Sequence, residues 1–442
     1  MKTATQNACK LCTPLGACLA FKGVEGCIPL LHGSQGCATY MRRYTISHYR
    51  EPIDIASTSF TEDTAIFGGG RNLTTAINNL ISQYNPQAIG IASTCLTETI
   101  GEDMNLLLSE FRKQHGENPL PTLFNVSTPS YRGTHADGYW AAIGAILSSL
   151  AKQEFPRNLG VITPGLVSPE DLRQLKKVFK VYDYPLLLMG DYSETLDGGV
   201  WESYKKISPG GVPVEQISQA GDASFCIDFT TLTQNGGTKY LGDNLNKQRF
   251  TIPMPIGVQL SDRFHRLMRK LTGKEIPEEF VVMRNRLLDA YTDAHKYTFG
   301  KKAVVYGEAE LVLSMAVFLE EIGIVPVLCA TGSDTKLLKA EIEQNLKHPE
   351  KVQVEVDLDF DDLTSLVHKG DADFLIGNSK GYKLSKALDI PLIRIGFPIH
   401  DRFGAARVKH IDYEGSLTLF DRVVNTLIEI KQNTSEIGYT YI

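Results

Sequence analysis

The stretch Ala88-Ile89-Gly90-Ile91-Ala92-Ser93-Thr94-Cys95 indicates the fold class of this chain. Its first five residues are small or apolar without alternation, which predicts a strand buried on both faces of a sheet. Apolar residues at helical spacing from Glu102 to Gln114 and a second apolar run, Leu123-Phe124-Asn125-Val126, complete a strand–helix–strand unit. Units of this kind form parallel sheets, and ligands bind beyond the carboxyl ends of their strands. Cys95 follows the first strand and is therefore expected at such an edge.

The same pattern recurs twice along the chain. One unit opens with the apolar run at 158–162, and the Gly-, Pro- and Ser-rich region from Ser193 to Asp222 behind it is predicted to be exposed loop. The other is the clearest, with strands at 302–307 and 325–329 around an apolar helix. A length of 442 residues corresponds to roughly three domains of about 150 residues. We therefore predict an α/β fold of three Rossmann-like domains with mostly parallel sheets, divided into residues 1–155, 156–297 and 298–442.

The composition excludes several classes of function. Lysine and arginine number 45 and aspartate and glutamate 51, a net charge of −6, so the chain lacks the basic excess that nucleic-acid binding requires. No basic segment precedes an apolar one at the N-terminus, and no apolar run approaches the roughly 20 residues of a membrane span. We therefore expect a cytoplasmic protein that binds neither nucleic acid nor membrane.

The eight cysteines are unevenly distributed, with five in the first 37 residues. Cys12, Cys37 and Cys95 lie among Gly, Pro, Ser and Thr at expected turns or strand ends, where a sulfur points away from the core. Such thiols can hold an iron–sulfur cluster, which usually takes four protein ligands. Three ligands in one chain predict a site shared at a subunit interface. The cysteines expected to be small buried hydrophobic residues are Cys18, Cys226 and Cys329.

Other interpretations of these motifs fit less well. Cys9-Lys10-Leu11-Cys12 has the spacing of a zinc knuckle, but no second pair completes four ligands, and a thioredoxin-type pair would follow a strand. Gly68-Gly69-Gly70 lacks the Lys-Ser/Thr of a nucleotide-binding loop, so we expect a tight turn before a helix at 72–84 and no ATP hydrolysis by this chain.

Two charged motifs leave alternatives open. His400-Asp401-Arg402 follows the last predicted strand. One interpretation is functional, namely that these residues bind an anion or donate protons. The other is structural, namely that Asp401 pairs with Arg402 and fixes the loop. Arg42, Arg43 and Arg50 either form a solvated helix face or offset the negative charge of a cluster near Cys37.

Four motifs resemble the nitrogenase component 1 superfamily. They are Pro29-Leu30-Leu31-His32-Gly33-Ser34-Gln35-Gly36-Cys37, Thr61-Glu62-Asp63-Thr64-Ala65-Ile66-Phe67-Gly68-Gly69, Thr94-Cys95-Leu96-Thr97-Glu98 and Ser127-Thr128-Pro129-Ser130-Tyr131. Their order and spacing are those of beta-type subunits. The resemblance implies the component 1 fold and cluster ligation by Cys12, Cys37 and Cys95. It adds Ser130 as a further ligand and the backbone amides of Gly16 and Gly36 as donors to cluster sulfurs.

Within this superfamily the chain resembles the beta-type subunit of the scaffold on which the iron–molybdenum cofactor is assembled. The short N-terminal arm and the ending His400–Arg407 carry that likeness. It implies an α2β2 heterotetramer with a homologous alpha-type subunit, a cluster that relays electrons from an ATP-dependent iron protein, and a cofactor precursor held mainly by the partner.

Three points stay open in the sequence. The cluster is a four-iron cluster or an eight-iron P-type cluster, because scaffold subunits of this type can keep only the cysteine at Cys12 whereas this chain keeps three. The alternative function is therefore the beta subunit of a nitrogenase or nitrogenase-like reductase, including a carbon–sulfur bond reductase. A different class of function is a small-ligand binding protein of periplasmic-binding-like fold, which the third domain alone would permit.

Overall fold

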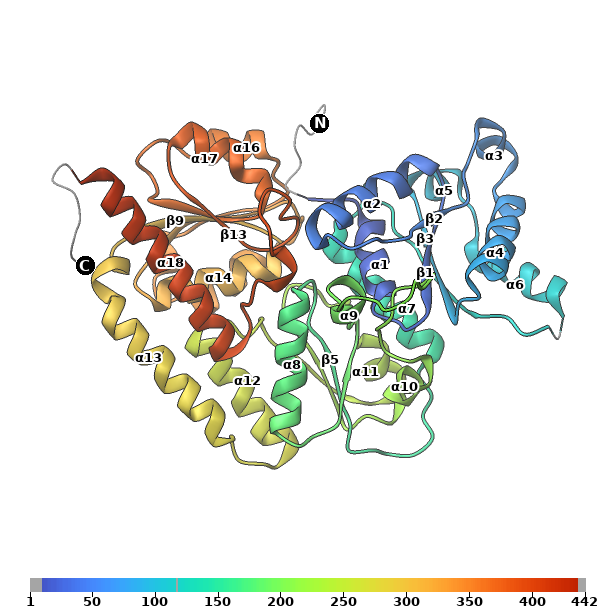
Figure 1. Ribbon diagram of the computed structural model, residues 1–442, viewed down its shortest axis with the longest axis horizontal. Coiled ribbons are helices and arrows are strands. Elements are labelled where there is room, and N and C mark those ends of the chain that lie inside the picture. Colours follow the sequence, from blue (N-terminus) through green and yellow to red (C-terminus); the bar gives the residue numbers. More distant parts are fainter. Residues whose placement is uncertain (1–9, 117, 436–442) are drawn as a thin grey trace.

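Three parallel β-sheets, each covered by helices on both faces, make up the computed structural model, which describes residues 10–116 and 118–435. Every pairing between named strands is parallel. The α/β prediction with parallel sheets is confirmed. The strands of the three sheets lie at 27–126, 160–251 and 302–394, each set inside one of the predicted domain ranges. Figure 1 shows the first unit at one end, the third at the other and the second below and between them.

The first sheet has the strand order β2-β1-β3-β4 and carries the predicted cysteine motifs. Leu73, Ile77 and Phe111 pack on one face, and Phe21 packs against Phe124 on the other. The helix expected at 102–114 is present as α6, and a short helix, α5, which was not predicted, precedes it and ends at Gly101, whose φ of 77° is left-handed. The elements are β1 (Cys27–His32), β2 (Ala56–Ser57), β3 (Ala88–Ser93), β4 (Thr122–Val126), α1 (Thr13–Lys22), α2 (Gln35–Tyr49), α3 (Glu62–Phe67), α4 (Gly70–Tyr84), α5 (Cys95–Ile100), α6 (Met104–His115) and α7 (His135–Leu150).

The second sheet has the order β6-β5-β7-β8. Its helix α8 begins with Ser168 as N-cap and a reciprocal capping box to Asp171, as the Ser-Pro-Glu-Asp motif favours. The prediction of loop at 193–222 is wrong in part, because short helices form at both ends of that region. The elements are β5 (Gly160–Thr163), β6 (Leu186–Leu188), β7 (Phe225–Asp228), β8 (Gln248–Thr251), α8 (Pro169–Val181), α9 (Ser193–Leu196), α10 (Val214–Ser218), η1 (Gln219–Asp222), α11 (Lys239–Leu245), α12 (Gly257–Thr272) and α13 (Glu278–Thr298).

The third sheet has the order β11-β10-β9-β12-β13. The strand order reverses at β9, with β10 and β11 on one side of it and β12 and β13 on the other. Long helices α13 and α18 cover the outer side of this unit (Figure 1). The elements are β9 (Lys302–Gly307), β10 (Val325–Thr331), β11 (Gln353–Glu355), β12 (Phe374–Gly377), β13 (Leu392–Arg394), α14 (Ala309–Glu321), α15 (Leu337–Asn345), η2 (Pro349–Lys351), α16 (Phe360–Leu366), η3 (Ser379–Gly381), α17 (Tyr382–Leu388), η4 (Ala405–Arg407) and α18 (Asp412–Thr434).

Buried histidine–carboxylate pairs join the units. Asp171 at the start of α8 accepts hydrogen bonds from the backbone nitrogens of His410 and Ile411 at 2.7 and 3.0 Å and from His410 Nδ1 at 2.9 Å. Burial alone would raise the pKa of Asp171, but these donors outweigh burial and lower it. His265 of α12 is paired with Asp412 of α18 at 2.9 Å, also fully inside the protein. The second and third units are therefore held together by buried polar contacts that water does not screen.

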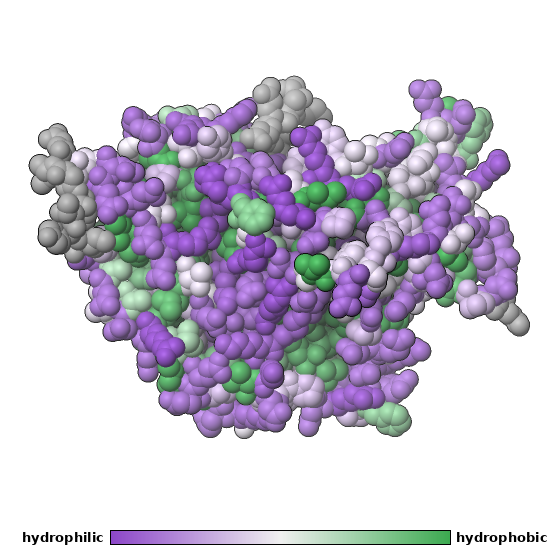
Figure 2. Space-filling model, in the orientation of Figure 1, coloured by the Kyte–Doolittle hydropathy of each residue, from purple (hydrophilic) through white to green (hydrophobic). Residues whose placement is uncertain are grey.

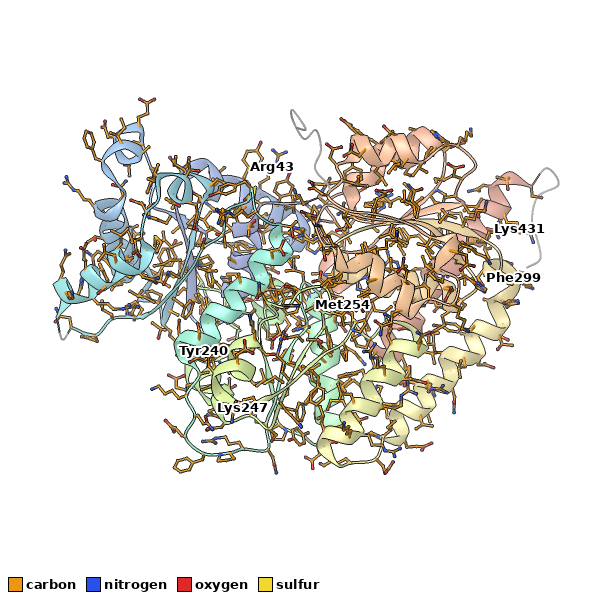
Figure 3. The ribbon with its side chains drawn as sticks, turned by 180° about the vertical axis from the view of Figure 1, so that it is seen from behind. Arg43, Tyr240, Lys247, Met254, Phe299 and Lys431 are labelled. Carbon is orange, nitrogen blue, oxygen red and sulfur yellow. The ribbon has the colours of Figure 1, made fainter. Side chains whose placement is uncertain are left out.

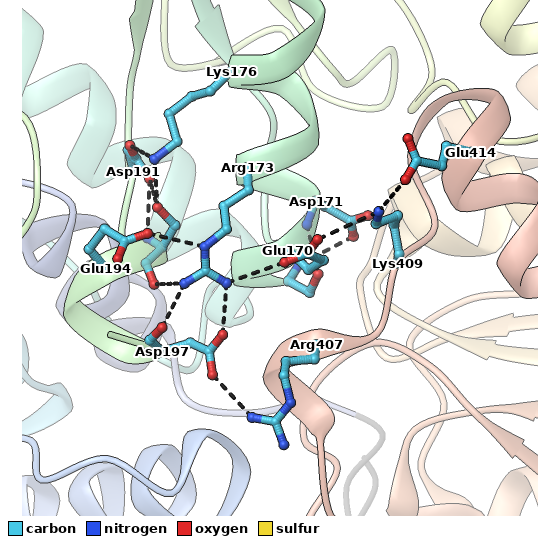
Figure 4. A network of polar contacts seen from close by, with 12 residues as sticks. Glu170, Asp171, Arg173, Lys176, Asp191, Glu194, Asp197, Arg407, Lys409 and Glu414 are labelled. Atoms are coloured by element: carbon cyan, nitrogen blue, oxygen red, sulfur yellow. Dashed lines mark hydrogen bonds and ion pairs between the residues drawn. The ribbon is translucent and has the colours of Figure 1, made fainter. Parts of the chain in front are cut away.

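An ionic network reinforces the same seam at the surface (Figure 4). Arg173 of α8 contacts Glu194 at 3.1 Å and Asp197 at 2.8 Å, and Asp197 also contacts Arg407 at 3.3 Å. Arg173 is 29% exposed, so this network is more sheltered than an ordinary surface ion pair. It fastens the loop that follows the third sheet onto the second unit.

The middle of the molecule is where all three units meet. Met254, labelled near the centre of Figure 3, lines a small cavity there together with His48 of the first unit and Ile399 of the third. His48 Nδ1 accepts a hydrogen bond from the Ile399 backbone nitrogen at 2.8 Å. Burial, and then the positive charges of His400 and Arg50, lowers the pKa of His48 to about 3. His48 is therefore neutral in the folded chain.

The outer surface is mainly hydrophilic on the face shown in Figure 2, where apolar side chains form separate small patches. None of the described helices combines the length and the apolar character needed to cross a membrane.

Candidate metal centre

Each of the three predicted cysteine ligands lies at the start of a helix of the first unit. Cys12 is the N-cap of α1, Cys37 lies in the first turn of α2, and Cys95 is the first residue of α5. Cys12 and Cys95 are exposed and Cys37 is half-buried. The N-terminus of a helix offers free backbone N–H groups and partial positive charge, which favour an anionic group. All three sulfurs thus stand where a negatively charged cluster is stabilised.

Hydrogen bonds connect Ser130 to Cys95 and to Thr13, the residue after Cys12. The backbone nitrogen of Ser130 donates to Cys95 Sγ at 3.3 Å, and the Ser130 hydroxyl accepts from the backbone nitrogen of Thr13 at 3.2 Å. Thr13 directly follows Cys12. Ser130 thus lies between the two ligand positions, with its hydroxyl beside the start of α1.

Cys37 lies within electrostatic reach of both other thiols. Burial, followed by the negative charges of Cys12 and Cys95, raises the pKa of the Cys37 thiol. A thiol whose charged form is opposed by two neighbouring thiols is expected where a positively charged metal group would offset the charge. In the described ranges, no three His, Cys, Asp or Glu side chains converge on a point that would hold one metal ion.

Cys12 and Cys37 open onto a cavity of about 600 Å³. Its walls are Leu15, Tyr40 and Tyr44, and Lys380 of η3 closes it from the third unit with its ammonium 5.7 Å from the Tyr44 ring centroid. An aromatic and aliphatic lining lowers the local dielectric constant, which is one determinant of cluster potential. Gly36 also lines this cavity.

Gly16 has a packing reason to be glycine. A Cβ atom there would lie 1.7 Å from the carbonyl oxygen of His135, and one at Gly138 would lie 1.9 Å from the carbonyl oxygen of Thr13. The two glycines therefore let α1 and α7 approach backbone to backbone. That close approach places Cys12, at the N-terminal end of α1, beside the segment that carries Ser130.

The remaining described cysteines behave as core residues. Cys18, Cys27, Cys226 and Cys329 are at most 2% exposed. Burial raises the pKa of Cys27, Cys226 and Cys329 to about 12 and raises that of Cys18 further, so these thiols stay protonated. Cys9, the other half of the candidate zinc spacing, lies outside the described residues.

The other sequence motifs have structural roles. Asp401 is bound mainly by Arg394, with closest contacts of 2.7 and 3.0 Å, and also by Ser379, whereas its contact with Arg402 is 3.6 Å. The expected Asp401–Arg402 pair is therefore secondary to a pair with the end of β13. Gly68 and Gly69 form the predicted turn between α3 and α4, and Gly70 begins α4.

Sequence reasoning missed His135 and Glu308. His135 begins α7, Glu308 follows β9 directly, and their side chains meet at 2.9 Å. Because functional groups gather beyond the carboxyl ends of parallel strands, the position of Glu308 directly after a predicted strand could have marked it as a candidate. Its partner lies 173 positions away, and no local signal reveals that pairing.

The comparisons with known proteins cover the whole chain. A family model described as nitrogenase component 1 type oxidoreductase matches residues 12–428. The chain belongs to the nitrogenase component 1 family. It is 32% identical to the nitrogenase molybdenum-iron protein beta chain of Clostridium pasteurianum, covering 96% of this chain and 93% of that one. It is 35% identical to the beta chain of Nostoc sp., covering 99% of this chain and 87% of that protein.

Solved structures agree with this assignment. A chain of nitrogenase Cp1 at pH 6.5 superposes with a TM-score of 0.96 and 31% identity, covering 100% of this chain and 97% of that chain. A chain of nitrogenase Cp1 at pH 5 has a TM-score of 0.72 with 15% identity and supports the fold alone. The expected superfamily and component 1 fold are confirmed, and the chain is a beta-type member.

Proposed function

We propose that this chain is the beta-type subunit of a nitrogenase-type complex and holds half of an iron–sulfur cluster at the interface with a homologous alpha-type subunit. Cys12, Cys37 and Cys95 supply the thiolate ligands in this proposal, and Ser130 supplies an oxygen. The observation that carries it is the arrival of three thiols and one hydroxyl, from three helix starts and one loop, at one edge of the first sheet.

The chain's part in the chemistry is to bind and orient. A cluster bound by these thiolates accepts and releases single electrons. Ser130 holds Cys95 through its backbone nitrogen and receives the Thr13 amide, so the loop and α1 keep the two sulfurs in fixed relation. The amides of Gly36 and Gly16 are proposed as donors to cluster sulfurs. The proposed electron source is an ATP-dependent iron protein, and the proposed assembly is an α2β2 heterotetramer.

Two roles are proposed for such a complex. The first is assembly of the iron–molybdenum cofactor, with the precursor held mainly by the alpha-type partner. The second is reduction of a substrate, as a nitrogenase or a nitrogenase-like reductase. The complete set of three thiols and the beta chains of molybdenum-iron proteins among the relatives favour the second role.

Ligand removal tests the cluster assignment. We expect Cys12→Ala, purified anaerobically in complex with the partner, to lose most of its bound iron and its reduced-state EPR signal. Cys226→Ala is the matched control, because Cys226 is a fully buried core cysteine of the second unit, and it should keep both. Iron content and EPR signal unchanged in Cys12→Ala would show the assignment to be wrong.

Assays on one preparation of the complex distinguish the two roles from each other and from the binding-protein alternative. A reductase complex consumes ATP and reduces substrate when mixed with its iron protein, whereas a scaffold complex instead transfers a metal cofactor to cofactor-free acceptor protein. A colourless complex without iron that binds a small ligand would support the periplasmic-binding-like function instead.

A further inference from the structure

The segment that carries Cys12 is clamped by one residue of another helix. The backbone nitrogen of Leu11 donates to His135 Nδ1 at 3.3 Å, and the backbone nitrogen of His135 donates to the carbonyl oxygen of Leu11 at 3.0 Å. Leu11 is 8% exposed, so water does not compete for either bond. Both backbone polar groups of Leu11, the residue immediately before Cys12, are thus bound by His135.

The imidazole of His135 is in turn oriented by Glu308 of the third unit. His135 Nε2 lies 2.9 Å from Glu308 Oε1, and the two side chains are 4% and 6% exposed. Because Nδ1 accepts from Leu11, the ring proton belongs on Nε2 and is donated to the carboxylate. Glu308 therefore selects the tautomer that can accept the Leu11 amide.

We propose that His135, oriented by Glu308, is a positioning residue for the Cys12 thiolate. This inference rests on the proposed function, since it needs Cys12 to be a cluster ligand. Loss of the Nδ1 acceptor leaves the Leu11 N–H unpaired and buried, and the Lys10–Leu11 peptide turns to recover a partner. That rotation changes the backbone of Leu11 and so displaces Cys12, the next residue, whereas Cys37 and Cys95 are carried by other segments. Groups that orient metal ligands typically change metal affinity about 10–100-fold when removed.

The chain contains a second buried pair of the same kind, which provides a control. His265 Nε2 lies 2.9 Å from Asp412, its Nδ1 lies 3.0 Å from the Tyr182 hydroxyl, and both partners of the ion pair are at most 1% exposed. His265 joins α12 to α18 and touches no candidate ligand. If His135 acts only by stabilising the fold, the two histidines should behave alike on substitution.

The experiment compares variants of the complex purified anaerobically with its partner. His135→Gln places a side-chain amide near the Nε2 position and loses the Leu11 acceptor, whereas His135→Asn places its oxygen near Nδ1 and keeps it. We expect iron loss to a chelator to be about 10-fold faster in His135→Gln, with a changed reduced-state EPR line shape, and near the parent rate in His135→Asn. We expect His265→Gln to lower the unfolding temperature without changing either cluster measurement.

The outcomes separate the inference from the proposed function. Equal chelation rates and EPR spectra in His135→Gln and His265→Gln, with iron lost in Cys12→Ala, would overturn the positioning role alone. Iron retained in Cys12→Ala would overturn both. If His135→Gln does not assemble, Glu308→Leu takes its place with Glu308→Gln as its control. Faster iron loss in the leucine variant only would support the role, and an unchanged EPR spectrum there would overturn it.

Discussion

Replacing Gly16 with alanine should damage the metal centre through the packing of two helices. The added Cβ would lie 1.7 Å from the His135 carbonyl oxygen and 2.7 Å from the Tyr139 backbone nitrogen. An ordinary carbon–oxygen contact is about 3.3 Å, so α1 and α7 must separate by roughly 1.6 Å. Overpacking by one methyl group typically costs about 1–3 kcal/mol, and the upper end applies here because both obstacles are backbone atoms. The free energy of unfolding should therefore fall by about 3 kcal/mol.

The displacement reaches the ligands because Cys12 begins α1 and Ser130 precedes α7 by one short loop. A shift of this size in one ligand exceeds what a cluster site tolerates, since positions within about 0.5 Å are required. We expect Gly16→Ala complex to hold less than about half of the parent's iron and to give a weaker reduced-state EPR signal.

The matched control for this prediction is Gly144→Ala. Gly144 lies on α7, the helix against which Gly16 packs, but the nearest atom to its Cβ would be the carbonyl oxygen of Gly237 at 4.0 Å. There alanine should be neutral or stabilise by up to about 1 kcal/mol through helix propensity. Denaturant unfolding and iron analysis of both variants make the comparison. Parent-like stability and iron content in Gly16→Ala would refute the argument from close helix approach.

Three further predictions concern stability. Asp171→Ala should lower the free energy of unfolding by about 3–5 kcal/mol, because the substitution leaves His410 and two backbone N–H groups buried without an acceptor. Urea titration measures this loss of stability, and a loss under about 1 kcal/mol would contradict the prediction. His48 is neutral in the folded chain with a pKa of about 3, against about 6.5 when unfolded, so the unfolded state binds more protons between those values and stability falls as pH drops through that window. Its share is about 1 kcal/mol between pH 6.5 and 5.5, and His48→Gln should remove that slope from stability measured at the two pH values. Cys226→Ala should cost about 1–2 kcal/mol in a thermal or chemical unfolding experiment, and a change in bound iron would contradict its assignment to the core.

The fold was accessible from sequence because its signals are local. A buried parallel strand such as β3 is an unbroken apolar run, and the α8 capping box is four adjacent residues. The errors arose where local signals conflict. The Gly- and Pro-rich region at 193–222 has loop composition, yet tertiary packing buries Leu196 and Ile217 and stabilises one-turn helices there.

The candidate ligands were accessible for a related reason, since each stands in a short motif with little freedom. Their mutual arrangement was not, because it depends on helix starts converging at one sheet edge. The helix at Cys95 was missed altogether, so the first-turn position of that sulfur appeared only in the structure. The Asp401–Arg394 pair shows the same limit: Arg402 is the nearer neighbour in sequence, but Arg394 at the end of β13 has the better geometry.

The metal centre also depends on a part of the chain that contributes no candidate ligand. Lys10 contacts Asp357 at 3.0 Å, His135 contacts Glu308, and Arg50 donates to the His400 carbonyl oxygen at 3.1 Å. All three contacts join the first unit to the third, and they lie on both sides of the Cys12 and Cys37 segments. The first unit alone does not fix the arrangement of the ligand motifs. Leu11, the residue before Cys12, is oriented by His135, and Glu308 of the third unit selects the tautomer of His135. A change in how the third unit sits would therefore be transmitted to Cys12 through Glu308 and His135, and to α2, which carries Cys37, through His48 and Arg50.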